Sequence, residues 1–267
     1  MTVDKLKDYL SFCERLAISA GEILIKEKST FKVTSQKDRQ DIATSADLTS
    51  EKFIVSSIVK SYPSHNIYSE EIGKMDKSSD FEWVIDPLDG TKEFVRDVPL
   101  FNCSIALTYK KEPIVSAIFR PIQNELYSAA KNIGSFFNGK KISVSNVSNL
   151  KDSFVYCYLP SYYRHPGGYD KAWKKLGRLG KKVYRLRSLA DENTAICWLA
   201  KGGCEAYLNI SNPPSIYDVL PGILIAKNAG AVVFGAQGEE LTTDMFGAIL
   251  IANNADIRDA IIDIVSG

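Results

Sequence analysis

The sequence predicts a mixed α/β fold in which an α+β first half packs against an α/β second half. A long amphipathic segment opens the chain, and short apolar segments at hairpin spacing follow it. From about residue 150, apolar segments alternate with helical ones. The 267 residues are enough for one large domain or two closely packed ones. Because no linker-like run separates the halves, we expect subdomains at 1–150 and 151–267 that form one unit.

The first half should open with a helix over about residues 3–28, where apolar residues recur at steps of three and four. Thr44 and Asp47 then have the T-x-x-D form of a capping box. They predict a second helix, which Pro63 would close. Only a polar stretch separates these helices, so two helices are expected before the first strand.

The five strands of the first half are expected next, and the last three of them follow one another at the short spacing of an antiparallel meander. Their predicted ranges are Asn66–Ser69, Phe81–Asp86, Cys103–Tyr109, Pro113–Phe119 and Glu125–Ala130. In the second half, apolar segments near 153–159, 182–186, 205–210 and 248–252 alternate with helical stretches near 168–178, 189–201, 216–229 and 255–265.

Composition excludes several classes of function. Lys and Arg number 33 against 32 Asp and Glu, a net charge of +1, so no global field would hold nucleic acid. The polar N-terminus and the lack of a run of roughly 18 uncharged residues predict neither a secretory signal nor a membrane span. Five cysteines without a CxxC pair fit a reducing cytoplasm, and two histidines are too few for a His-rich zinc site. The chemistry should rest on carboxylates, hydroxyls and backbone.

The most informative segment runs from Asp86 to Thr91. An apolar strand delivers Asp86, and Pro87 and Gly90 force a tight turn that returns Asp89 beside it. Neighbouring carboxylates repel one another unless a cation lies between them, and Mg²⁺ is the simplest such cation. If Thr91 opens a helix, its first amides also form an anion cradle. The alternative is a solvated turn, since Asp, Pro and Gly are common turn residues.

Two further acidic positions bear on this choice. Glu70 follows a short predicted strand, and Asp218 stands where a loop becomes an apolar helix. Each has a simpler interpretation, a surface charge for Glu70 and an N-terminal helix cap for Asp218. Pro221 is compatible with that helix only in its first turn, so the helix should begin close to Tyr217.

Taken together, four segments resemble the inositol monophosphatase superfamily of Mg²⁺-dependent, lithium-sensitive phosphatases: Asp41-x-x-Thr44-x-x-Asp47, Glu70-Glu71, Asp86-Pro87-Leu88-Asp89-Gly90-Thr91 and Asp218. The resemblance implies a layered αβαβα sandwich and two or three Mg²⁺ ions. The implied metal ligands are Glu70, Asp86, the Leu88 carbonyl, Asp89 and Asp218. Asp47 and Thr91, together with Glu70, are implied as the catalytic groups that orient and activate the attacking water.

The substrate is expected to be a small phosphate monoester. Asp89-Gly90-Thr91-Lys92-Glu93-Phe94 is closer to the 3′(2′),5′-bisphosphate nucleotidases, which favours hydrolysis of 3′-phosphoadenosine 5′-phosphate to AMP and phosphate. Inositol 1-phosphate or another sugar phosphate is the alternative, and a catalytically silent phosphate-binding protein is an alternative of another class. A homodimer is left open. The expected substrate contacts are Gly90, Thr91, Ser188 and Asn209.

Overall fold

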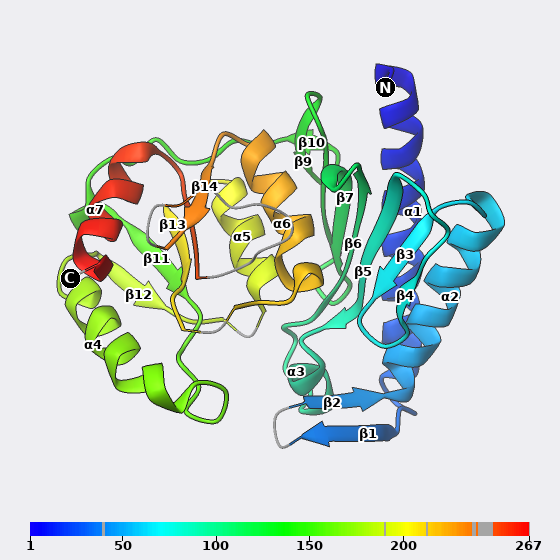
Figure 1. Cartoon of the computed structure of the whole chain (residues 1–267), viewed down its shortest axis with the longest axis horizontal. Coiled ribbons are helices and arrows are strands. Elements are labelled where there is room, and N and C mark those ends of the chain that lie inside the picture. Colours follow the sequence, from blue (N-terminus) through cyan, green and yellow to red (C-terminus); the bar gives the residue numbers. More distant parts are fainter. Residues whose placement is uncertain (39–40, 190, 212, 237–238, 240–247, 267) are drawn as a thin grey trace.

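Helices and sheets alternate as layers in the computed structural model, which describes residues 1–38, 41–189, 191–211, 213–236, 239 and 248–266 (Figure 1). Helices α1 and α2 cover the outer face of a larger sheet, and α5 and α6 lie between this sheet and a smaller one. Helices α4 and α7 cover the outer face of the smaller sheet. The layered αβαβα sandwich expected from the resemblance is confirmed.

Helix α1 (Val3–Glu27) follows the predicted range, and its apolar stripe packs on the larger sheet. Helix α2 (Ser45–Ser61) begins at the predicted capping box, where the Thr44 amide donates to Asp47 Oδ2 at 2.9 Å. The expectation of two helices before the first strand is wrong, because a hairpin of β1 (Val33–Asp38) and β2 (Asp41–Thr44) lies between them. The described residues of β1 are polar or exposed, so no apolar alternation marked the strand.

The larger sheet has the strand order β10-β9-β8-β7-β6-β5-β3-β4. Its members are β3 (Asn66–Ser69), β4 (Gly73–Met75), β5 (Phe81–Asp89), β6 (Asn102–Tyr109), β7 (Glu112–Arg120), β8 (Glu125–Ala130), β9 (Gly134–Phe137) and β10 (Lys140–Lys141). The five predicted strands are confirmed; the short β4, β9 and β10 were not predicted. Strands β3 and β5 run parallel, with Ser69 opposite Ile85. Their carboxyl ends therefore meet at one edge.

The smaller sheet has the order β12-β11-β13-β15-β14. Its strands are β11 (Phe154–Cys157), β12 (Arg185–Arg187), β13 (Ala206–Asn209), β14 (Val232–Gly235) and β15 (Ile249–Ala252). The helices of this half are α4 (Tyr169–Gly180), α5 (Glu192–Ala200), α6 (Ile216–Asn228) and α7 (Ala255–Ser266). All four predicted segments form strands, and all four predicted helices are present. Strand β14 was not predicted, and residue 190 of the stretch predicted as helical lies outside the described residues.

Helix α6 corrects one expectation. It begins at Ile216, close to the predicted start, yet Pro221 lies inside the helix and beyond its first turn. A proline there has no N–H to donate and clashes with the carbonyl four residues earlier, which belongs to Tyr217. The helix nevertheless continues to Asn228, because side chains of other elements serve the freed carbonyl, as described below.

All five cysteines are buried free thiols, and no helix among the described residues is both long and apolar enough to cross a membrane.

The contact between α1 and β7 generates a stability prediction. A Cβ at Gly21 would lie 2.4 Å from a ring carbon of Phe119, so Gly21→Ala forces α1 away from the sheet. We expect a loss of about 1–3 kcal/mol of unfolding free energy, measured by urea titration. Gly177→Ala in α4, where a Cβ meets nothing within 4 Å, is the matched control and should be neutral or stabilising. Equal effects of the two variants would contradict the prediction.

Candidate active site

A cavity of about 410 Å³ lies where the ends of β3 and β5 face the first turn of α6. It contains most of the predicted site: its lining includes Glu70, Asp86, Leu88, Asp89, Gly90, Thr91 and Asp218. The parallel pairing of β3 and β5 continues one residue further, since the Glu70 amide donates to the Ile85 carbonyl at 3.2 Å. This pairing places Glu70 beside Asp86. Buried Glu51 of α2 holds the following loop by accepting from the Glu71 amide at 3.1 Å.

The tight turn predicted after Asp86 is present. The pairing of β5 with β6 shifts register between Asp86 and Asp89, and the Leu88 amide donates to Asp86 Oδ1 at 3.0 Å. Gly90 has φ +88°, and a Cβ there would lie 2.6 Å from the Leu100 carbonyl oxygen, so only glycine fits. Helix α3 (Thr91–Val95) starts directly after it. The turn thus returns Asp89 to the same cavity as Asp86.

Asp47 and Thr91 form a direct pair, although Asp47 comes from α2. Thr91 Oγ1 lies 3.1 Å from Asp47 Oδ1 and 2.9 Å from the Leu88 carbonyl oxygen. Asp47 is fully buried, and burial raises its pKa to about 6 against the lowering effect of hydrogen bonds from Thr44 and Thr91. A hydroxyl can both accept and donate a proton. The pair can therefore relay a proton between the cavity and a carboxylate that titrates near neutral pH.

The carboxyl groups of the cavity destabilise one another's charged forms. Burial and the neighbouring charge of Asp218 raise the pKa of Glu70 to about 8. Burial and then nearby carboxylates raise the pKa of Asp86 and Asp89 well above the usual range. Burial raises the pKa of Asp218 to about 6. Among the described residues, no Lys or Arg forms an ion pair with any of these four groups.

This donor set fits Mg²⁺. The candidate ligands are hard oxygen donors, four carboxylates and the Leu88 carbonyl, as Mg²⁺ prefers. Lys92 and Arg164 line the cavity and oppose the rise in the pKa of Asp218 without preventing it, so a divalent cation would supply positive charge that the carboxylates still lack. Within the described ranges, no three His, Cys, Asp or Glu side chains already surround one point as a preformed metal centre.

Sequence reasoning missed the neutral donors that hold Asp89. Asn102 Nδ2 donates to Asp89 Oδ2 and to Asp191 Oδ1, each at 3.1 Å, and Asn193 Nδ2 lies 3.3 Å from Asp89 Oδ2. Both asparagines are fully buried. Neither belongs to a recognisable motif, and their pairing joins residues far apart in the chain. Glu192 also lines the cavity and is 8% exposed.

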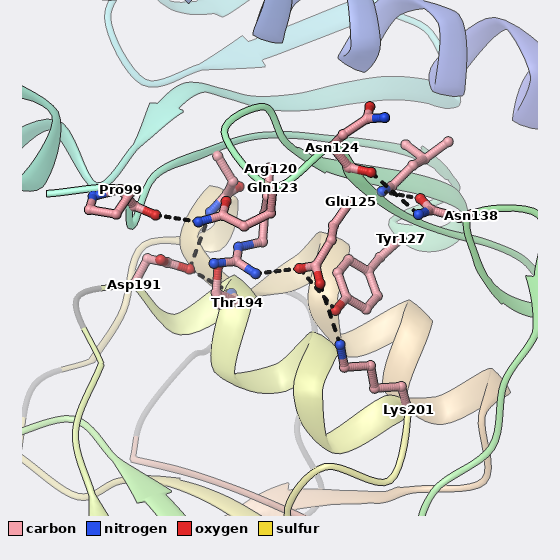
Figure 2. A network of polar contacts seen from close by, with 12 residues as sticks. Pro99, Arg120, Gln123, Asn124, Glu125, Tyr127, Asn138, Asp191, Thr194 and Lys201 are labelled. Carbon is pink, nitrogen blue, oxygen red and sulfur yellow. Dashed lines mark hydrogen bonds and ion pairs between the residues drawn. The ribbon is translucent and has the colours of Figure 1, made fainter.

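Behind the cavity, a polar network joins β7 and β8 to α5 (Figure 2). Buried Arg120 forms an ion pair with Glu125, and Lys201 Nζ lies 3.6 Å from Glu125 Oε1. Asp191 caps α5 by accepting from the Thr194 amide at 2.5 Å. Its pKa is raised to about 6 by burial, with Arg120 among the groups that oppose the rise. The network fixes the start of α5 beside the larger sheet.

Two of the predicted substrate contacts, Ser188 and Asn209, do not line the cavity. Ser188 is exposed, and its hydroxyl lies 3.5 Å from the Leu189 carbonyl oxygen. Asn209 is fully buried, and its Oδ1 accepts from the Ser211 amide at 3.3 Å. Neither is among the described residues that line the cavity, whose basic members are Lys92 and Arg164.

Comparison with known proteins assigns the family. The model of the inositol monophosphatase family matches residues 5–266. This chain belongs to that family. An inositol monophosphatase family relative from Aquifex aeolicus, named fructose-1,6-bisphosphatase/inositol-1-monophosphatase, is 30% identical over 98% of this chain and 97% of its own. The Nus factor SuhB of Pasteurella multocida is 31% identical over 86% of this chain and 85% of its own.

Solved structures of the inositol monophosphatase family share the fold. The extragenic suppressor protein suhB of Bartonella henselae superposes with a TM-score of 0.88 at 26% identity, covering 97% of this chain and 98% of that one. The inositol monophosphatase of Anabaena gives 0.84 at 26% identity, with 98% and 96% covered. Members of the inositol monophosphatase family are phosphoric monoester hydrolases and are generally Mg²⁺-dependent, so this chain is a phosphoric monoester hydrolase. The nucleotidase branch favoured by the Lys92 segment is not represented among these names.

The raised carboxyl pKa values predict how stability depends on pH without metal. Glu70, Asp47 and Asp218 bind protons more tightly in the folded than in the unfolded chain. The unfolding free energy should therefore fall between pH 5 and 8, by about 1.4 kcal/mol per pH unit for each carboxyl protonated only in the folded state. Thermal unfolding in EDTA, repeated across this pH range, measures the decrease in unfolding free energy.

Millimolar Mg²⁺ should reduce this fall, because the cation stabilises the ionised carboxylates. A buffer without divalent cations, brought to equal ionic strength with a monovalent salt, is the control for salt screening. A metal-free protein that becomes more stable from pH 5 to 8 would contradict the assignment of these groups.

Proposed function

We propose that this protein is a Mg²⁺-dependent, lithium-sensitive phosphomonoesterase that transfers the phosphoryl group directly to water, with two or three ions held by Glu70, Asp86, the Leu88 carbonyl, Asp89 and Asp218. The observation that carries the proposal is the 3.1 Å contact between Thr91 Oγ1 and Asp47 Oδ1. A phosphate-binding protein without activity needs the ligand carboxylates but has no use for a buried proton relay at the cavity wall.

The proposed mechanism assigns separate tasks to the residues of the cavity. Mg²⁺ ions held by the ligand carboxylates would neutralise charge on the phosphoryl oxygens and lower the pKa of a bound water. Thr91 Oγ1 orients the attacking water and passes its proton toward Asp47, and Glu70 assists in orienting that water. The amides of Gly90 and Thr91 contact the phosphate at the start of α3.

The proposed substrate is a compact polyol or sugar monophosphate, as the printed names of the relatives suggest. Buried Glu192 lines the cavity, where burial and then the charges of Asp218 and Asp191 raise its pKa well above the usual range. In its ionised form it would repel a second phosphate group. Several basic residues of this half do not line the cavity: Lys171 and Arg178 lie on α4 and Lys181 directly follows it, while Arg185 and Arg187 are exposed on β12.

The second candidate substrate is 3′-phosphoadenosine 5′-phosphate. Lys92 of the segment that resembles the nucleotidases does line the cavity, and Arg164 lines it too. These two cations could receive the second phosphate, which Glu192 opposes. A phosphate-release screen over both substrates and fructose 1,6-bisphosphate, in a cytoplasm-like reducing buffer, tests the two candidates together.

Replacing the hydroxyl of Thr91 should separate catalysis from metal binding. We expect Thr91→Ala to lower kcat by about 10² to 10⁴, because the water loses its proton acceptor, while the calorimetric Mg²⁺ affinity changes little. Thr91→Ser retains the hydroxyl and is the matched control, with activity close to that of the unsubstituted protein. Normal turnover with weakened Mg²⁺ binding in Thr91→Ala would instead make Thr91 a structural residue.

Substrate preference should depend on the charge of Glu192. We expect kcat/KM for inositol 1-phosphate to exceed that for 3′-phosphoadenosine 5′-phosphate by about tenfold or more, a difference of about 1.4 kcal/mol. Glu192→Gln should shift the ratio toward the bisphosphate, because a carboxyl group that repels the second phosphate whenever it ionises is removed. A ratio that favours the bisphosphate in the unsubstituted enzyme would overturn the polyol assignment and support the nucleotidase alternative.

A further inference from the structure

Pro221 leaves the first turns of α6 short of one backbone donor. In a regular helix, the amide of residue 221 would donate to the carbonyl of Tyr217, and proline has no amide hydrogen. The carbonyl lies next to Asp218, one of the candidate metal ligands. A buried carbonyl without a donor would cost about 1–3 kcal/mol, so this turn needs a partner from outside the helix.

Asn193 of α5 supplies that partner. Its Nδ2 lies 3.2 Å from the Tyr217 carbonyl oxygen, and its Oδ1 accepts from the Gly222 amide at 3.1 Å. One side-chain amide thus holds α6 on both sides of Pro221. Gly222 permits the approach, since a Cβ there would lie 3.0 Å from Asn193 Oδ1 and 3.1 Å from Ile196.

The same amide reaches the other half of the cavity. Asn193 Nδ2 is 3.3 Å from Asp89 Oδ2 and 3.3 Å from Ser104 Oγ, and Ser104 Oγ in turn lies 3.4 Å from the Tyr217 carbonyl oxygen. The two hydrogens of this buried amide are shared among three acceptors. Asn193 therefore contacts both the strand that carries Asp89 and the helix turn that carries Asp218.

We propose that Asn193 is a positioning residue that sets the separation between Asp89 and Asp218. Asn193 has this role because Pro221 lacks the amide that would otherwise donate to the Tyr217 carbonyl. The proposal rests on the proposed function for its metal. Asn193 and Asn102 both donate to Asp89 Oδ2, which leaves Oδ1 as the ligand atom. Being neutral, both amides orient the carboxylate without replacing the cation.

The test compares Asn193→Ala with Thr194→Val. Thr194 is the next residue of α5, is equally buried, and its hydroxyl has no partner among the described residues, so Thr194→Val controls for substitution in this helix. We expect Asn193→Ala to weaken Mg²⁺ binding by about 10- to 100-fold in calorimetry, as loss of an outer partner of a ligand does. KM for Mg²⁺ should rise in parallel, with Thr194→Val unchanged. Unaltered Mg²⁺ affinity in Asn193→Ala would overturn the proposal.

A double-mutant cycle with Pro221→Ala separates positioning from general loss of stability. Pro221→Ala restores a backbone amide that can donate to the Tyr217 carbonyl, so Asn193→Ala should cost less unfolding free energy in that background. The Mg²⁺ affinity should remain low, because the tie to Asp89 is still missing. If Asn193→Ala alone does not fold, the Mg²⁺ affinity is measured in the double variant and compared with that of Pro221→Ala. If Asn193→Ala does fold, additive effects of the two substitutions on unfolding free energy would contradict the role assigned to the proline.

The positioning role of Asn193 and the proposed phosphatase activity can be refuted separately. A protein that binds Mg²⁺ but releases no phosphate from any ester in the screen would refute the proposed activity and leave the calorimetric comparison of Asn193→Ala intact. Normal activity with equal Mg²⁺ affinities in Asn193→Ala and Thr194→Val would refute the positioning role alone.

Discussion

Carboxylates buried together around one cavity are the constraint on which the arrangement of this protein depends. Burial disfavours their charged forms and their charges repel one another, and both effects, burial first, raise the pKa of Glu70. Two backbone features nonetheless bring them together: the parallel ends of β3 and β5, and the first turn of α6. In the proposed function, a bound cation would offset the remaining cost. The fold therefore carries an electrostatic strain that such a cation would relieve.

The groups that hold these carboxylates are mostly uncharged. Asn102 and Asn193 donate to Asp89, Thr44 donates to Asp47, and backbone amides donate to Glu51. A lysine in any of these places would have neutralised a carboxylate and competed with the metal. Neutral donors fix geometry while leaving the charge in place, which is what a site for a divalent cation requires. The charged network around Arg120 lies behind the cavity, where it anchors α5 instead.

The sequence predicted the parts of the protein whose signal is local. The capping box at Thr44, the turn through Gly90 and the strands of the meander each depend on a few consecutive residues. Features that depend on partners far along the chain were missed. Asn193 has no local signature, because its role arises only when α5 meets Pro221 of α6, and the same proline was wrongly confined to a first turn. Ser188 and Asn209, which the resemblance placed at the substrate, do not line the cavity, and their role as substrate contacts stays a prediction.

The location of Asp89 and Asp218 on opposite sides of the boundary between the larger sheet and α6 affects the protein's opening fluctuations. A bound cation would span this boundary, so the ends of β5 and α6 could not separate without first releasing it. Amide exchange in α3 and in the first turns of α6 would then proceed through the metal-free fraction of molecules. Metal occupancy, and not only packing, would set how often the two halves of this chain come apart.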